Sequence, residues 1–387
     1  MSHSTITPSS LQSILFTHKD FSSCFFRNPT KRELEFRSYF HATMTLLATD
    51  ERIQLSRYHS VGRIGYDLLS IFGILILKLH YHIRTMKETL LLLQENMNLR
   101  DILDISQVPS EASMSRLSRK IKNIVSINTL HERLISVYTQ EMDRIIGHLS
   151  IDSTTIEARE KPFRKPKPAQ MEPTPPQKRG RKAKGSQEEQ EYRERIAKEE
   201  EARVHYLAES PEKSISELEM RCSITAKQNS KGKKQWFIGY KAHIATDDFG
   251  VPICFVVTGA CVHDSKVAVP LLKLAKQKTE FFYILLDKGY ISPAVNDYAD
   301  MIERTVIIDR KGYKGVSPIP LEPAYAERYK ARTTVERTNS ELKDGFLPDK
   351  IYKRGSQARY EMQLAILLTT VKKVSNMLLL KKESAAA

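Results

Sequence analysis

The spacing of hydrophobic and polar residues divides this chain into a helical first part and a mixed second part. Over roughly the first 143 residues, apolar positions recur every three or four residues. This spacing predicts helices over about 30–50, 62–82, 86–97, 111–125 and 128–146. Farther along, short apolar runs lie between turn residues, which predicts strands alternating with helices. We therefore expect an all-α domain followed by an α/β domain.

Strands are predicted at several places in the second part. The segment HLSIDSTTIEAR mixes apolar and β-branched residues, which is typical of a strand. A hairpin is expected where two segments, about 235–245 and 251–260, flank the turn DDFG (247–250). The apolar run FFYILL (281–286) is expected to be buried on both faces, as the inner strand of a parallel sheet. A last strand is predicted over 304–310.

Aspartates interrupt or follow these strands. Asp152 lies within the first strand, where an ionised carboxylate is costly unless it is paired or holds a metal ion. The alternative is an aspartate at a strand end that faces water. Asp287 directly follows FFYILL, and active sites in parallel sheets gather at the carboxyl ends of the strands. Asp264 precedes a predicted helix, which leaves two interpretations: a helix cap, or a carboxylate close to a metal ion.

The segment YAERYKARTTVERTNSELK (325–343) is predicted to be a helix with two distinct faces. At helical geometry, four polar residues fall within an arc of about 60°: Tyr329, Arg332, Glu336 and Lys343. The opposite side carries residues suited to packing on a sheet: Ala331, Val335, Thr338 and Leu342. A carboxylate between cations suits a catalytic site, but a solvated helix surface carries similar mixtures of charge.

A shorter helix after Pro109 is a candidate for DNA recognition. Ser110 is expected to cap it, and its polar side carries Ser113, Arg116 and Lys120. A short helix with a basic face after a tight turn is typical of helix-turn-helix readers of the major groove. An ordinary amphipathic helix of a bundle fits the same pattern, so both interpretations stay open.

The composition changes abruptly after the first strand. Residues 161–185 hold nine Lys or Arg, one Glu and six Pro, which cannot build a hydrophobic core. Within this segment, Arg179 and Arg181 suit a narrow minor groove, although a plain basic tether has the same composition. Residues 187–205 then predict a charged, solvated helix outside the main domain.

The charge of the chain indicates its partner. The 387 residues carry a formal net charge of +15, so a polyanion such as DNA or RNA is the first candidate and an anionic membrane surface the second. The four cysteines are scattered, which indicates neither a zinc site nor a disulfide framework. No apolar leader opens the chain, and the longest apolar run (68–77) is about half of a membrane span. We therefore expect a cytoplasmic protein that does not enter membranes.

The spacing Tyr-x2-Arg-x3-Glu-x6-Lys between Tyr329 and Lys343 resembles the signature around the catalytic glutamate of bacterial insertion-sequence transposases of the DDE type. Three more motifs look like those of the same family: GYKAH (239–243), VHDS (262–265) and DKGY (287–290). The resemblance covers roughly 145–345. In contrast to some relatives, this chain has no large insertion between Asp287 and Glu336, and its extra segment follows Asp152 instead.

This resemblance implies an RNase H-like catalytic domain, a mixed five-stranded sheet flanked by helices, preceded by an all-α DNA-binding domain. It also implies two Mg²⁺ (or Mn²⁺) ions, with Asp152 bridging both, Asp287 on one and Glu336 on the other. Arg332, Lys343 and Tyr329 are then expected along the DNA backbone.

The implied function is a DNA transposase that binds the ends of its element, cuts them and joins them to a target. Its expected partners are double-stranded DNA and a second copy of the chain, since two ends are cut together. An RNase H-like nuclease without strand transfer and a non-catalytic, domesticated DNA-binding copy are the alternatives. We expect a helical DNA-binding domain over 1–143 and a catalytic domain in two pieces, 144–158 and 222–346. A basic linker with a charged helical insertion is expected over 159–221, and a carboxyl-terminal helix over 347–387.

Overall fold

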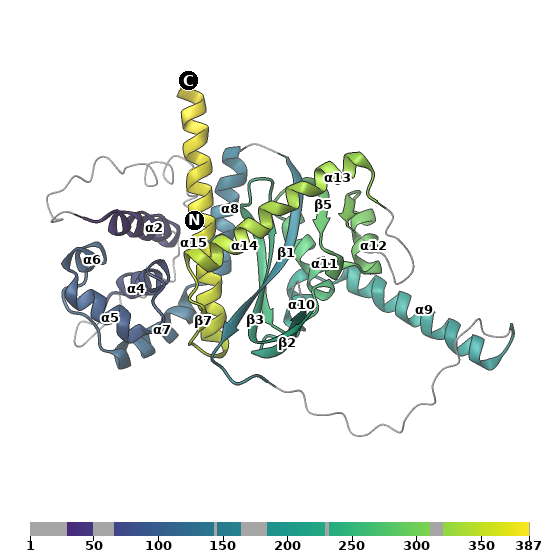
Figure 1. Cartoon of the computed structure of the whole chain (residues 1–387), viewed down its shortest axis with the longest axis horizontal. Helices are drawn as coiled ribbons and strands as arrows, with labels where there is room; N and C mark the ends of the chain where they lie inside the picture. Colours follow the sequence, from purple (N-terminus) through teal and green to yellow (C-terminus); the bar gives the residue numbers. More distant parts are fainter. Residues whose placement is uncertain are drawn as a thin grey trace, which may run out of the picture.

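A computed structural model describes residues 29–48, 66–142, 145–163, 184–228, 232–309 and 320–386. In these residues a group of helices lies beside a mixed sheet, and the long helix α15 (Gly355–Ala386) runs between the two (Figure 1). The predicted fold class, an RNase H-like α/β domain preceded by a helical region, is confirmed.

The sheet has seven strands, two more than expected. They are β1 (Ile146–Ala158), β2 (Ser223–Gln228), β3 (Lys234–Thr246), β4 (Pro252–Gly259), β5 (Phe281–Leu286), β6 (Thr305–Ile308) and β7 (Lys350–Ile351). β1 lies in the middle, antiparallel to β3 and parallel to β5, and β6 continues the parallel side. The order β4-β3-β1-β5-β6 is the expected mixed sheet. The prediction missed β2 and β7 because one is short and polar and the other has only two residues.

β3 is long enough to have two partners along one edge. Its second half pairs with β4 on that edge and with β1 on the other, whereas residues 234–238 pair only with β2. β3 passes β1 closely at Gly239, where an added Cβ would lie 2.0 Å from the carbonyl oxygen of Ile156. A residue with a side chain would therefore push the two strands apart. The turn between β3 and β4 is the predicted hairpin, with Gly250 at a φ of +77°.

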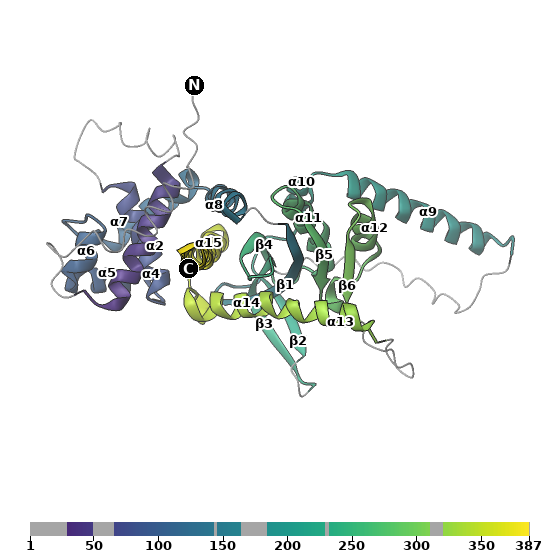
Figure 2. The ribbon, with the colours of Figure 1, turned by 90° about the horizontal axis from the view of Figure 1, so that it is seen from above.

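Helices cover both faces of the sheet (Figure 2). One face carries α11 (Ser265–Lys276) and α12 (Pro293–Met301), and the other carries α13 (Pro323–Tyr329) and α14 (Thr333–Gly345). A 3-10 turn at 330–332 joins α13 to α14, where one continuous helix was expected. The chain keeps its direction there because the flanking residues, Tyr329 and Thr333, retain helical dihedral angles. Val335, Thr338 and Leu342 are buried, as predicted.

The helical part contains α2 (Lys31–Ala48), α4 (Leu68–His80), α5 (Met86–Glu95), α6 (Met97–Ile102), α7 (Glu111–Ile124) and α8 (Ile127–Met142). The helix expected over 86–97 ends early because Asn96 accepts a hydrogen bond from the Leu99 N–H, which starts α6, and also donates to Glu33. Ser110 caps α7, as predicted.

Two further expectations concern exposure. α9 (Gln187–Ala208) projects away from the sheet (Figure 1), and Leu207 is its buried residue, so the solvated helix is confirmed. It is followed by the short α10 (Pro211–Ser216). β5 is not buried along its whole length, because Phe282 is 52% exposed near its start. None of the helices in the described ranges is long and apolar enough to cross a bilayer.

Candidate active site

The three acidic residues singled out by the sequence lie on neighbouring elements. Asp152 is in the middle of β1, and Asp287 directly follows β5. Since Ile151 pairs with Leu286 in the parallel register, Asp152 and Asp287 are the next residues along two adjacent strands. Glu336 lies in the first turn of α14, which packs on β1.

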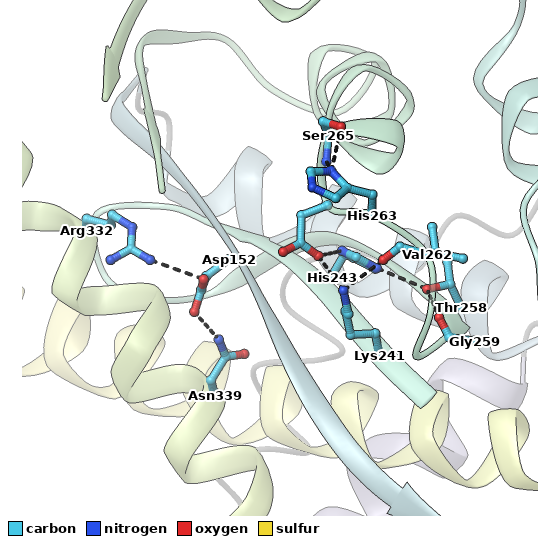
Figure 3. Close-up of polar contacts among 11 residues, drawn as sticks. Asp152, Lys241, His243, Thr258, Gly259, Val262, His263, Ser265, Arg332 and Asn339 are labelled. Atoms are coloured by element: carbon cyan, nitrogen blue, oxygen red, sulfur yellow. Dashed lines mark hydrogen bonds and ion pairs between the residues drawn. The ribbon is translucent and has the colours of Figure 1, made fainter. Parts of the chain in front are cut away.

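Two side chains from the α14 side hold Asp152 (Figure 3). Arg332 donates from Nη2 to Oδ1 of Asp152 at 3.1 Å and from Nη1 to Oε1 of Glu336 at 2.5 Å. Asn339 donates from Nδ2 to Oδ2 of Asp152 at 2.9 Å. The side chain of Glu336 is 52% exposed, whereas that of Asp152 is 22% exposed. The site is therefore closed around Asp152 and open at Glu336.

The electrostatics of the site favour a further cation. Burial raises the pKa of Asp152 above its ordinary value, and the negative charges of Glu336 and Asp287 raise it further. Arg332 opposes this rise without cancelling it. For Arg332 itself, burial favours a lower pKa, but the surrounding carboxylates raise the pKa overall. One guanidinium thus leaves an excess of negative charge around Asp152.

The donor set fits a divalent metal ion. Three carboxylates supply the hard oxygen ligands that Mg²⁺ prefers, and no imidazole or thiolate is needed. Within the described part of the chain, no three His, Cys, Asp or Glu side chains are grouped closely enough to hold an ion, and Glu336 is bonded to Arg332. The fit therefore rests on the donor chemistry of the three carboxylates.

The other two residues of the signature have different surroundings. The hydroxyl of Tyr329 donates to the carbonyl oxygen of Leu286 at 3.1 Å, so this half-buried side chain anchors α13 beside Asp287. Lys343 is exposed on α14, about two turns beyond Glu336. Tyr329 and Arg332 thus come together at the carboxylates, whereas Lys343 lies on the surface.

Asp264 does not cap α11, so the helix-cap interpretation is wrong. Its backbone is already helical, and its side chain makes no cap hydrogen bond. Lys241 donates instead from Nζ to Oδ1 of Asp264 at 2.9 Å and to the carbonyl oxygen of Val262 at 2.8 Å. Burial alone would raise the pKa of Asp264, but the ammonium of Lys241 lowers the pKa overall. An unpaired buried ammonium costs more free energy than an uncapped helix start, which explains why Asp264 bonds to Lys241 and not to the first turn of α11.

The Lys241–Asp264 pair lies behind β1. Lys241 pairs with Thr155, and since neighbours along a strand point to opposite faces, its side chain points away from the face that carries Asp152. Figure 3 shows the two groups of contacts separately. An added Cβ on Gly289 would lie 3.5 Å from Oδ2 of Asp264, so the pair reaches the loop that follows Asp287.

Sequence reasoning missed several residues of this region. Asn339 lies nearly one turn after Glu336, so the helical spacing could have indicated it. The contact between Lys241 and Asp264 joins two motifs that are distant in sequence, and only the packed sheet reveals it. His243 is buried between Thr258 at 3.1 Å and Asp264 at 3.7 Å, and burial lowers the pKa of His243 to about 3 although Asp264 opposes this shift.

The remaining predicted DNA-binding residues divide into two groups. Arg116 and Lys120 are exposed on α7, whose opposite side is buried mainly against α4. This exposed basic face is available for a partner. Arg179 and Arg181 lie outside the described residues.

Comparison with protein families gives two matches. Residues 144–371, more than half of the chain, match a family described as "Transposase DDE domain". Residues 46–120 match a family described as "Transposase domain (DUF772)", which takes in α4, α5, α6 and most of α7. No curated protein and no solved structure matches the chain.

Proposed function

The chain belongs to the family of DDE transposases, and from this premise we propose that it cuts DNA at the ends of an insertion sequence and joins those ends to a target. The observation that carries the proposal is the placement of Asp152 and Asp287 on adjacent strands, with Glu336 on the helix that packs over them. We further propose that the reaction takes place on the cytoplasmic, nucleoid DNA of a bacterium.

Asp152, Asp287 and Glu336 are the proposed catalytic residues and metal ligands. Asp152, whose side chain is 22% exposed, would face both ions, Asp287 would bind one and the more exposed Glu336 the other. When bound, two Mg²⁺ or Mn²⁺ ions supply activation of the attacking oxygen and neutralisation of the leaving oxygen in an in-line phosphoryl transfer. Asn339 keeps one oxygen of Asp152 oriented, which fixes the carboxylate for that task.

Arg332 and Lys343 are proposed to hold phosphates. Arg332 already bonds to two of the carboxylates, so its charge lies where a scissile phosphate would need one. Lys343 would contact a phosphate farther along the same helix. Tyr329, which bonds to Leu286, would position the end of β5 and border the DNA backbone.

The remaining parts are proposed to bind DNA away from the chemistry. Arg116 and Lys120 on α7 would contact the element end, and the basic segment 161–185 with Arg179 and Arg181 would add affinity for any DNA. Two copies of the chain would act on two ends. In this proposal, recognition of the element end belongs to the helical region (1–143) and the chemistry to the catalytic domain in two pieces (144–158 and 222–346). Affinity for any DNA belongs to the insertion (159–221), and the chain ends with the segment 347–387.

Three single substitutions test the catalytic assignment: Asp152→Asn, Asp287→Asn and Glu336→Gln. Each should lower the rate of Mg²⁺-dependent end cleavage by at least about 100-fold, because each removes a ligand charge, while DNA affinity changes little. Cleavage and joined products are measured separately on labelled element ends. Glu327→Gln, a 72% exposed carboxylate on α13, is the matched control and should cut normally.

The outcomes separate the candidate functions. A variant that still cuts at a tenth of the normal rate would remove its residue from the site. Cleavage without joined products would favour the nuclease, and specific binding without cleavage would favour a non-catalytic copy.

A further inference from the structure

β2 and the first five residues of β3 form a two-stranded ribbon that leaves the sheet (Figure 2). β3 pairs with β1 only from Gly239 onward and with β4 only from Tyr240 onward. Residues 234–238 therefore pair with β2 alone, and among the described residues no helix packs on them closely enough to bury their side chains. We call residues 223–228 with 234–238 the β2–β3 ribbon.

The ribbon exposes the largest apolar side chain of the protein. Trp236, the single tryptophan of the chain, is 71% exposed, the highest value among the large apolar side chains of the described residues. Ile238, on the same side of the strand, is 39% exposed. Their cross-strand partners, Ala226 and Ile224, extend this apolar face. An exposed tryptophan beside other apolar residues is typical of a contact surface, since folded monomers usually cover such groups.

This exposed face looks toward the same side as the catalytic carboxylates. Every second residue of a strand points to the same face, so Trp236 and Ile238 lie on the same face of β3 as Ile244. Ile244 pairs directly with Asp152. Eight residues separate Trp236 from Ile244, which corresponds to about 25 Å along an extended strand. At about 3.4 Å per base pair, this is the length of roughly seven base pairs of duplex.

The charge around the ribbon favours a polyanion as its partner. Residues 223–238 contain four Lys and no Asp or Glu. Lys233 and Lys234 are exposed beside Trp236. A second copy of the same basic ribbon would be repelled, whereas phosphates would be attracted. A two-stranded ribbon also has the width that the major groove of DNA admits.

We propose that the β2–β3 ribbon is a further DNA-contact element, which binds duplex about seven base pairs from the phosphate that lies at Asp152. Trp236 would lie against bases or sugars in the groove, and the lysines would contact phosphates. This proposal rests on the proposed transposase function and adds to it a contact outside both the catalytic carboxylates and α7.

The single tryptophan makes the contact directly measurable. The full chain carrying Glu336→Gln, which should bind without cutting, is titrated with element-end duplexes that extend about 3 or about 15 base pairs beyond the cleavage point on either side. The long extension on one side should quench the fluorescence of Trp236 and protect it from acrylamide, and the short one should not. An unchanged signal with every tightly bound duplex would overturn the proposal. So would protection that rises with protein concentration in the absence of DNA, because the ribbon would then bind another copy.

Substitution gives an independent readout. Trp236→Ala should weaken binding to the long duplex by about 5- to 100-fold, the range of single stacking contacts, and leave binding to the short one unchanged. Phe282→Ala, which removes a 52% exposed aromatic from β5, is the matched control. Equal affinities of the Trp236→Ala and Phe282→Ala proteins for the long duplex would also overturn it. Normal end cleavage by the wild-type chain in the same experiment shows that such a failure concerns the ribbon and not the transposase function.

Discussion

At the scale of single residues, the carboxylates proposed to set the chemistry of this protein also cost it stability. Asp152 is half-enclosed and surrounded by other negative charges, so its pKa is raised and its ionised form is disfavoured in the fold. Arg332 and Asn339 keep it in place. The proposed binding of a cation would require such charges to be held together beforehand, at a cost in stability.

Asp247, in the hairpin turn, carries a similar cost without a proposed catalytic task. It is 2% exposed and accepts hydrogen bonds from the hydroxyl of Tyr138 and the N–H groups of Phe249 and Val251. Burial raises the pKa of Asp247 to about 6, although these hydrogen bonds oppose the rise. A carboxyl group whose pKa is raised by folding stabilises the protein at pH values below its pKa in the unfolded state, near 3.9. This stabilisation is lost as the pH rises through the pKa in the folded state, about 6.

The substitution Asp247→Asn tests this linkage. Asparagine keeps an oxygen acceptor for the two backbone N–H groups and carries no charge, so the free energy of unfolding should rise by about 1–3 kcal/mol at pH 8. At about pH 4 the two proteins should be equally stable, because the wild-type carboxyl is then largely protonated. Denaturant unfolding at both pH values checks this, with the exposed Asp300→Asn as a control expected to show no difference. A less stable Asp247→Asn protein at pH 8 would contradict the assignment.

At the scale of elements, the sequence predicted most helices and strands because their period is local. The apolar run before Asp287 and the hairpin at Gly250 were identified in this way. Errors arose where a side chain had a distant partner. Asn96 ends an expected helix early because its side chain caps the next helix and bonds to Glu33, and Asp264 bonds to Lys241 and not to its own helix start. The three acidic residues could be singled out, whereas the contacts that hold them could not, since these need the packed sheet.

The clearest link between elements is the buried ion pair of Lys78 on α4 and Glu361 on α15. The charged atoms are 2.5 Å apart, and the side chains are 3% and 10% exposed. Lys78→Met should lower the free energy of unfolding by about 3–5 kcal/mol, because it leaves a buried carboxylate unpaired. The double variant Lys78→Met with Glu361→Leu should recover most of this loss.

The exposed pair Arg84–Asp349 is the control for that prediction. It also links the helical part to the segment before α15, at 2.8 Å, but its side chains are 57% and 83% exposed. Arg84→Ala should therefore cost less than about 1 kcal/mol. Unfolding of all four proteins in denaturant, at one pH and salt concentration, compares the two pairs. If Lys78→Met lowers the free energy of unfolding no more than Arg84→Ala does, the packing of α4 against α15 does not depend on the buried pair.

At the scale of the whole molecule, DNA is proposed to meet the described residues at three exposed basic places. α7 lies in the helical part, Lys343 on the helix above the sheet, and the β2–β3 ribbon beyond its edge. Helix α15 connects the first two of these places, since it contacts both α7 and α14. A duplex held at two or three of these places would be fixed relative to the carboxylates, whichever base sequence lies at the cleavage point.

Base reading is then expected at a distance from the chemistry, and Arg116 on α7 is the residue that tests it. If α7 enters the major groove, Arg116→Ala should cost about 1–3 kcal/mol of binding free energy on the element end and much less on random DNA. Lys343→Ala, at a proposed phosphate contact, should weaken binding to both DNAs alike. Lys87→Ala, an exposed cation on α5, is the control and should change neither. Dissociation constants are measured for both DNAs at one fixed salt concentration, because phosphate contacts depend steeply on salt. An equal loss on the two DNAs for Arg116→Ala would place α7 on the backbone, and sequence recognition would then have to lie elsewhere in the chain.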